Sequence, residues 1–238
     1  GDVATHQITA MFIDLRGFTA LFERLDPKEG YRMLIEYFGR MSPIIRKHQG
    51  IVIQFLGDGI MASFMGAADA AVDAVIEMVR SLEEMNRGRE IPRVGSVHRG
   101  AGLHSGQVML ATIGSEERLD ITAVGDTVNS TARIEAATKA LGAPVLISEE
   151  VMWRMLNPSA YDLRELGKVR VHGRKDPLEL VEVFGREPEA LEPPGVVGLR
   201  ELLLARPAEE DHAEELHHHV ARERRHEPAQ GAITTVVG

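Results

Sequence analysis

The chain has 238 residues, enough for one large domain or for an ordinary domain with an appendage. It contains no cysteine, which excludes disulfides, zinc–thiolate sites and thiol catalysis. The net charge of −9, from 27 basic and 36 acidic residues, argues against a general nucleic-acid binder, and no stretch approaches the ~18 apolar residues that a membrane span needs.

Strands and helices are predicted to alternate along the chain. Short apolar runs between turn signals predict strands at 8–15, 51–55, 60–64, 100–104, 107–113, 144–147, 168–171 and 178–184. Helical spacing of apolar residues predicts helices over 31–45, 67–89 and 126–141, the last capped by Asp126, and a short helix over 148–156 capped by Ser148. The Asp-Gly pair between the runs at 51–55 and 60–64 predicts a hairpin.

This mixture of strands, helices and hairpins favours an α+β sandwich over a purely parallel sheet, and the order of the first elements is ferredoxin-like. Three prolines, three glutamates and a glycine at 187–195 predict a linker. We therefore expect one domain over 1–186, a Pro-rich linker over 187–195, and a histidine-containing tail over 196–238 that is partly helical or disordered. The tail is acidic, since the chain from Glu189 onward has ten acidic and five basic residues.

Two aspartates stand where this fold brings strand ends together. Asp14 ends the first predicted strand, and Asp58 lies at the tip of the hairpin that flanks it in a ferredoxin-like sheet. Paired carboxylates at adjacent strand ends suit two divalent cations, whose other ligands are water and substrate phosphates. The alternative is that both are ordinary turn residues, because Asp-Gly is common in plain turns.

Two further segments carry groups that suit phosphate chemistry. Gly17, Phe18 and Thr19 follow the first strand and open a helix, where exposed amides can hold phosphate oxygens. Asn129 and Arg133 are four residues apart and project from one helix face, where an amide and a guanidinium can orient a sugar and neutralise a phosphoryl transition state. Spacing alone also fits a plain turn and an exposed polar helix face.

Four motifs occur in order over residues 5–184. They are Phe12-Ile-Asp-Leu-Arg-Gly-Phe-Thr19, Phe55-Leu-Gly-Asp-Gly59, Gly102-Leu-His-Ser-Gly-Gln-Val108 and Val124-Gly-Asp-Thr-Val-Asn-Ser-Thr-Ala-Arg133. Together they resemble the motifs of the class III nucleotidyl cyclase catalytic domain, bacterial type. The resemblance implies a palm-type sandwich and a cytoplasmic enzyme that converts ATP to 3′,5′-cyclic AMP and pyrophosphate with two divalent cations, Mg²⁺ or Mn²⁺.

The resemblance also implies a head-to-tail homodimer, in which each composite active site takes its metals from one subunit and its transition-state pair from the other. The matching positions are, for the metals, Asp14, Asp58 and the backbone carbonyl of Leu15; for the transition state, Asn129 and Arg133; for base selection, Gln54 and Thr122; and for the triphosphate, Arg174.

One position departs from the family pattern. Gln54 stands four residues before Asp58, where adenylyl cyclases usually have lysine and guanylyl cyclases usually have glutamate. A glutamine amide both donates and accepts hydrogen bonds, so it suits adenine or guanine, and cyclic GMP made from GTP is the main alternative product. Threonine at position 122 is typical of many bacterial adenylyl cyclases and favours ATP.

The same residues bear on two other functions. A domain that binds nucleotide without catalysis is a second alternative, although binding alone has no need of Arg133. A diguanylate cyclase shares the palm-like sheet, but its Gly-Gly-Asp/Glu-Glu-Phe hairpin does not occur here. Nucleic acid is not an expected partner. The resemblance implies that a membrane or sensor module can precede Gly1, because domains of this family commonly follow one.

Overall fold

The computed structural model describes the backbone of residues 4–16, 18, 22–23, 25–87, 98–115, 118–186 and 233–235, and the side chains of all of these except 4, 98–99, 110–115, 118–122 and 233–235. The elements are β1 (Ala4–Arg16), α2 (Pro27–Lys47), β2 (Gly50–Leu56), β3 (Gly59–Met65), α3 (Asp69–Arg87), β4 (His98–Ser115), β5 (Arg118–Val124), α4 (Asp126–Ala140), β6 (Val145–Ser148), α5 (Glu149–Met152), β7 (Tyr161–Arg170), β8 (Leu178–Arg186) and β9 (Ile233–Thr235).

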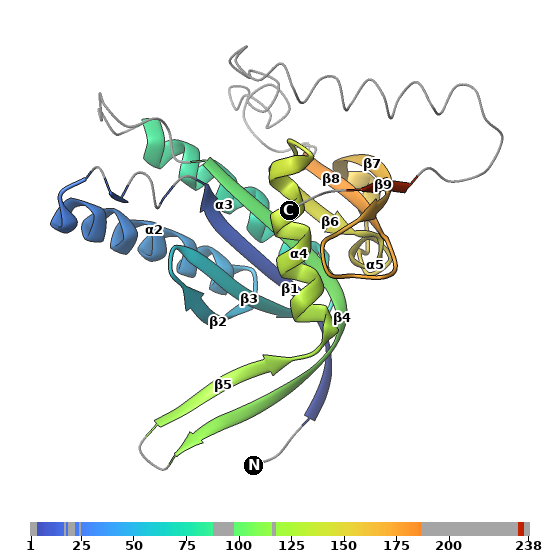
Figure 1. The fold of residues 1–238 in the computed structure, drawn as a ribbon, viewed down its shortest axis with the longest axis horizontal. Helices are drawn as coiled ribbons and strands as arrows, with labels where there is room; N and C mark the ends of the chain where they lie inside the picture. The colour runs from blue at the N-terminus through green and yellow to red at the C-terminus, as the bar shows by residue number, and fades with distance from the viewer. Residues whose placement is uncertain are drawn as a thin grey trace.

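The strands form one sheet in the order β2-β3-β1-β4-β6-β8-β7-β9, and β5 pairs with β4 outside this path. Neighbours are antiparallel except β4 with β6 and β7 with β9. Helices α2 and α3 lie behind the sheet and α4 lies in front of it, while β4 and β5 extend beyond the other strands as a two-stranded arm (Figure 1). The expected α+β sandwich around a mixed, mostly antiparallel sheet is confirmed.

The side chains of β1 alternate between the two faces of the sheet, and this alternation determines which of them face the site. Met11, Ile13 and Leu15 are buried in the core that α2 and α3 form with the sheet. Successive side chains of a strand point to opposite faces, so Asp14 and Arg16 lie on the other face, together with α4. The apolar pattern of the strand therefore fixes the side on which its polar end is presented.

Glycines on β4 allow α4 to pack directly on the strand. A β-carbon built on Gly102 would lie 2.3 Å from the backbone nitrogen of Glu135 and 2.7 Å from the carbonyl oxygen of Thr131. One built on Gly106 would lie 2.4 Å from Oγ1 of Thr127. No side chain fits in this space, so the glycines set how closely α4 approaches the sheet and thereby where its polar residues lie.

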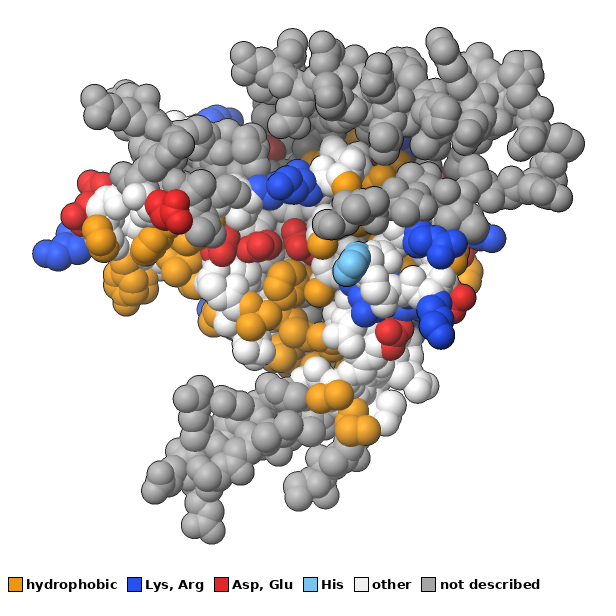
Figure 2. Space-filling model, viewed as in Figure 1, with side chains coloured by type: hydrophobic (Ala, Val, Ile, Leu, Met, Phe, Trp, Pro, Cys, Tyr) orange, Lys and Arg blue, Asp and Glu red, His pale blue; other side chains and the backbone are white. Residues whose placement is uncertain are grey.

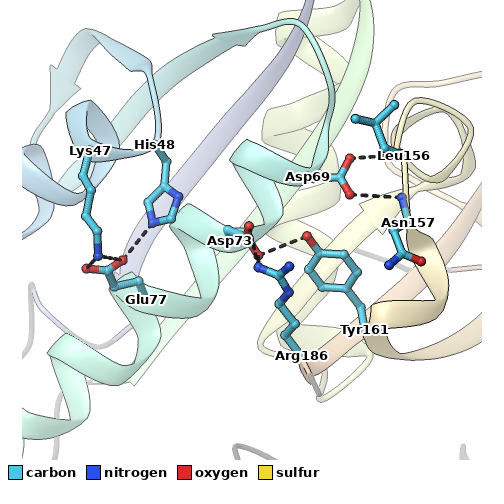
Figure 3. A network of polar contacts seen from close by, with 9 residues as sticks. All are labelled: Lys47, His48, Asp69, Asp73, Glu77, Leu156, Asn157, Tyr161 and Arg186. Carbon is cyan, nitrogen blue, oxygen red and sulfur yellow. Dashed lines mark hydrogen bonds and ion pairs between the residues drawn. The ribbon is translucent and has the colours of Figure 1, made fainter. Parts of the chain in front are cut away.

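An acidic row on α3 joins the helix to its neighbours (Figure 3). Asp69, Asp73 and Glu77 recur at four-residue spacing and therefore share one face of the helix. Asp73 accepts hydrogen bonds from the Tyr161 hydroxyl and from Arg186 Nη1, each at 3.0 Å. The other two acids bind the segment after α5 and the C-terminal end of α2. These contacts hold the helix layer to the sheet away from the predicted site.

Several local predictions are wrong at their boundaries. Residues 100–113 lie in one continuous strand, the 18-residue β4, and not in two, because pairing with β1 continues through Ser105 and Gly106. The N-cap of α4 is Gly125 and not Asp126, whose carboxylate binds Arg174 instead of a backbone N–H of the first turn. Ser148 is the N-cap of α5, but its hydroxyl bonds His104 at 2.8 Å and that helix has only four residues.

The C-terminal predictions fall largely outside the described residues. The linker at 187–195 and the tail at 196–238 lie there except for β9, which pairs parallel with β7 and which the sequence pattern does not predict. Among the described helices, none combines the length and the apolar character needed to cross a membrane.

Candidate active site

The two aspartates predicted to hold metal lie together at the tip of the β2–β3 hairpin. The turn residues are Gly57 and Asp58, and Gly57 has φ +64°, which favours glycine. Oδ1 of Asp14 would lie 3.5 Å from a β-carbon built on Gly59, the residue after Asp58. Burial of Asp14 and its contact with the Asp58 carboxylate raise the pKa of Asp14 to about 6.

A third carboxylate, Glu135 of α4, faces the same place. Its Oε1 would lie 2.5 Å from a β-carbon on Gly100, which pairs with Asp14 in the β1–β4 ladder, and Nε of Arg16 would lie 3.4 Å from the same atom. Burial, together with the charges of Asp14 and Asp58, raises the pKa of Glu135 to about 7, although Arg16 opposes the shift. The sequence pattern does not reveal Glu135, because its position depends on the register that sets Gly100 opposite Asp14.

The donor set fits a divalent cation. Asp14 and Asp58 repel each other as neighbouring carboxylates, and a cation between them relieves this repulsion through the oxygen ligands that Mg²⁺ and Mn²⁺ prefer. The Leu15 N–H donates to Asp14 Oδ1 at 2.9 Å and so helps to orient that carboxylate. Within the described part of the chain no three His, Cys, Asp or Glu residues form a metal cluster, so a backbone carbonyl such as that of Leu15, water and substrate phosphates would complete the coordination.

The raised pKa values predict that the metal-free protein loses stability as the pH rises. Asp14 and Glu135 bind protons more tightly in the folded chain than in the unfolded one, so the free energy of unfolding falls between about pH 4 and about pH 7. After allowance for solvent screening we expect a loss on the order of 1–2 kcal/mol.

Thermal melts in EDTA from pH 5 to pH 8 measure this loss. Saturating Mg²⁺ should raise the melting temperature more at pH 8 than at pH 5. The Asp14→Asn and Glu135→Gln variants should each flatten the metal-free profile, and a profile that neither variant alters contradicts the assignment.

The predicted transition-state pair lies on another side of α4. Asn129 is exposed and Arg133 is half-buried, and a β-carbon built on Gly173 would lie 3.4 Å from Arg133 Nη2. Residues two apart on a helix do not share a face, so Arg133 and Glu135 project from different sides of α4. A single chain thus presents the acidic pair and the Asn129–Arg133 pair on two sides of the same helix.

Arg174, predicted to contact the triphosphate, is bound to the N-terminal half of α4. Its Nη1 donates to Asp126 Oδ2 at 2.5 Å and to Ser130 Oγ at 2.6 Å. Burial favours a higher pKa for Asp126, but the hydrogen bond and charge of Arg174 outweigh it and lower that pKa. The turn that carries Arg174 also carries Gly173, which lies beside the Arg133 guanidinium, so this turn packs against α4 near both ends of the Asp126–Arg133 segment.

The two positions assigned to base selection come from strands that approach each other. Gln54 is exposed on β2, just after a register shift that follows Val52. Thr122 pairs with Ala111 in the β4–β5 arm, and its side chain lies outside the described residues. Strands β2 and β5 contact each other although they are not neighbours in the sheet.

Of the segment predicted to bind phosphate through its amides, Gly17 and Thr19 lie outside the described residues. Phe18 is described, and its side chain is buried with its ring 5.6 Å from that of Phe22. The Phe18 side chain therefore packs in the core, and phosphate binding by the backbone amides of this segment stays a prediction.

Fold and site together define a class of domain: a palm-type α+β sandwich with paired carboxylates at a hairpin tip and an amide–guanidinium pair on the covering helix. A family model described as the adenylate and guanylate cyclase catalytic domain matches residues 3–183. The chain belongs to this family, and the resemblance of its four motifs is confirmed.

The relatives agree with this assignment. The chain is 35% identical over 192 residues to an adenylate cyclase of Anabaena cylindrica and 32% identical over 185 residues to adenylate cyclase 1 of Rhizobium meliloti (strain 1021). These matches cover 77% and 75% of this chain but 38% and 28% of those proteins, so the chain spans about a third of the curated relatives that it matches.

Solved structures include members with either product in their names. The adenylyl cyclase CyaB from P. aeruginosa superposes with a TM-score of 0.68 at 26% identity and covers 77% of this chain and 96% of that one. The guanylyl cyclase Cya2 superposes with a TM-score of 0.66 at 32% identity and covers 80% and 97%. The fold is therefore that of both kinds of cyclase.

Proposed function

We propose that this chain is the catalytic domain of an adenylate cyclase, which converts ATP to 3′,5′-cyclic AMP and pyrophosphate with two divalent cations, Mg²⁺ or Mn²⁺. The observation that carries the proposal is the contact of Asp14 with Asp58 at the hairpin tip, on the side of the sheet that α4 covers. The names of the curated relatives favour ATP over GTP.

Each residue has a defined task in this proposal. Asp14 and Asp58 would hold the cations, whose positive charge would activate the ribose 3′-hydroxyl and stabilise the pyrophosphate. The Asn129 amide orients the ribose, and the Arg133 guanidinium neutralises negative charge that develops on the phosphoryl group. The chain's own contribution is thus orientation and electrostatic stabilisation, as is usual in phosphoryl transfer.

The proposal includes a homodimer, because α4 divides the site. Arg133 and Glu135 project from different sides of this helix, and it is Glu135 that faces the acidic pair of its own protomer. A second copy arranged head to tail would bring its Asn129–Arg133 pair to that acidic pair.

The surface supports this arrangement. Acidic side chains form a short row beside an apolar patch, and basic side chains gather on the side of β7 and β8 (Figure 2). Ile51, Phe55 and Leu56 of β2 are 52%, 47% and 44% exposed, which is a large apolar exposure for one strand. Exposed apolar clusters with a polar rim are typical of protein interfaces.

Guanylate cyclase activity is the second candidate function, favoured by Gln54 and by the 32% identity to the guanylyl cyclase Cya2. If Gln54 contacts the base, Gln54→Lys should raise the ratio of kcat/KM for ATP to that for GTP by about tenfold, because lysine only donates hydrogen bonds. Gln7→Lys is the matched control: it is exposed on β1, about 20 Å along the strand from Asp14, and should not change the ratio. An unchanged ratio in Gln54→Lys removes this residue from the base pocket.

The proposed function is tested by incubation with ATP, GTP, CTP and UTP in Mg²⁺ or Mn²⁺ and measurement of the cyclic products. We expect cyclic AMP to predominate and Asp14→Asn to abolish it. Tight nucleotide binding with no cyclic product from any of the four would reject catalysis and leave a nucleotide-binding module.

A further inference from the structure

We infer that Asp126 is a positioning residue for the triphosphate, because it holds Arg174 against α4 from a turn whose Gly173 lies beside Arg133. The inference rests on the proposed function and adds to it a residue that acts only through another. Asp126 is the first residue of α4, whereas Arg174 lies in the turn between β7 and β8, 48 positions further along the chain.

The contact has three members. Arg174 Nη1 donates to Asp126 Oδ2 at 2.5 Å and to Ser130 Oγ at 2.6 Å, and the Ser130 hydroxyl in turn donates to Asp126 Oδ2 at 3.3 Å. Asp126 and Ser130 are four residues apart, so they offer Arg174 two acceptors on one face of the helix. The guanidinium is thereby held at two points of a rigid element.

The Asp126–Arg174 pair lies where a ligand can reach it. The Asp126 side chain is 67% exposed and that of Arg174 is 24% exposed, so the pair lies at the surface beside Gly173 and Arg133. A guanidinium has five N–H donors, and Asp126 and Ser130 both bind Nη1. In the arrangement that we infer, Nη2 of Arg174 donates to a phosphate oxygen.

Holding Arg174 in advance matters because an arginine side chain loses much rotational freedom when it binds a phosphate. A side chain that Asp126 already orders loses less freedom on binding, so the triphosphate binds more tightly. If Asp126 instead competed with phosphate for Arg174, its removal would strengthen binding. The sign of the change in KM therefore separates positioning from competition.

The test is a double-mutant cycle on the steady-state kinetics of cyclic AMP formation. We expect Asp126→Asn to raise the KM for ATP by about fivefold with little change in kcat, and Arg174→Ala to raise it at least as much. The double variant should equal Arg174→Ala alone, because the effect of Asp126 passes through Arg174. Asp126→Glu should restore most of the wild-type KM.

Glu179→Gln is the matched control, since it breaks the exposed Lys168–Glu179 ion pair of the same hairpin and should leave KM unchanged. Additive effects in the double variant, or a lower KM in Asp126→Asn, would overturn the inference. Thermal melts identify any variant that fails to fold, and Asp126→Glu then keeps the comparison possible.

Calorimetric binding of ATP and of inorganic pyrophosphate by the same variants measures the positioning role without turnover. Weaker binding of both in Asp126→Asn supports the inference even if the wild-type chain makes no cyclic product. Unchanged binding of both overturns it even if the wild-type chain is active. Failure of the proposed function and failure of the inference are thus distinguishable.

Discussion

A mixture of Asp58→Ala and Arg133→Ala chains should recover about one quarter of the wild-type activity, although each variant alone is reduced by about 10³-fold. Random exchange makes half of the dimers mixed, and each mixed dimer has one composite site with both lesions and one with neither. The measurement is cyclic AMP formation after the two purified variants have been mixed and allowed to exchange.

The control is a mixture of Asp58→Ala with Asp14→Ala. Both lesions then lie in the metal half of the site, so no intact composite site forms and activity should not return. Exchange is verified independently with two affinity tags. If tagged subunits exchange and the first mixture stays inactive, the division of the site between two subunits is wrong.

Replacement of Gly102 with alanine should be the most damaging small substitution in the sheet. A β-carbon there would lie 2.3 Å and 2.7 Å from backbone atoms of α4, which cannot move aside as a flexible side chain can. We expect a loss of about 2–4 kcal/mol in the free energy of unfolding and a fall in kcat of about 100-fold, because the displaced helix carries Asn129 and Arg133.

Gly39→Ala is the control for the removal of a glycine. Gly39 is exposed in the middle of α2, and a β-carbon there meets no atom within 4 Å. The higher helix propensity of alanine should stabilise that variant by up to about 1 kcal/mol and leave the activity unchanged. Chemical denaturation measures the free energy of unfolding of both variants, and cyclic nucleotide assays measure their kcat. If Gly102→Ala and Gly39→Ala have the same stability and the same kcat, the packing argument is wrong.

The sequence predicts those parts of the fold in which local pattern and long-range packing agree. The β2–β3 hairpin follows from two apolar runs and a turn at Gly57 and Asp58, which puts Asp58 at its tip. Asp14 is predicted at the end of the first strand but lies two residues before it, because β1 continues to Arg16. By contrast, β9 has three residues, too few to mark a strand, and β5, although seven residues long, pairs only with β4 in an arm that extends beyond the other strands.

The missed parts of the site depend on register. Glu135 reaches the acidic pair because Gly100 lies opposite Asp14, and a shift of one residue would turn Gly100 to the other face of the sheet. Arg174 meets Asp126 only because the β7–β8 turn folds back on α4. Such contacts join residues far apart in the chain, and no local spacing encodes them.

Helix α4 has one further consequence. In a head-to-tail dimer, α4 of each subunit would border both composite active sites, with Glu135 facing one site and Arg133 facing the other. Binding of cations and nucleotide at one active site would then act on α4, which also forms part of the second active site. Because α4 packs directly on the backbone of β4, a displacement of the helix at one site would be felt at the other. A dimer with one intact active site then need not have half the activity of the wild-type dimer. The difference between the activity of the mixed variants and one quarter of the wild-type activity measures how strongly the two active sites are coupled.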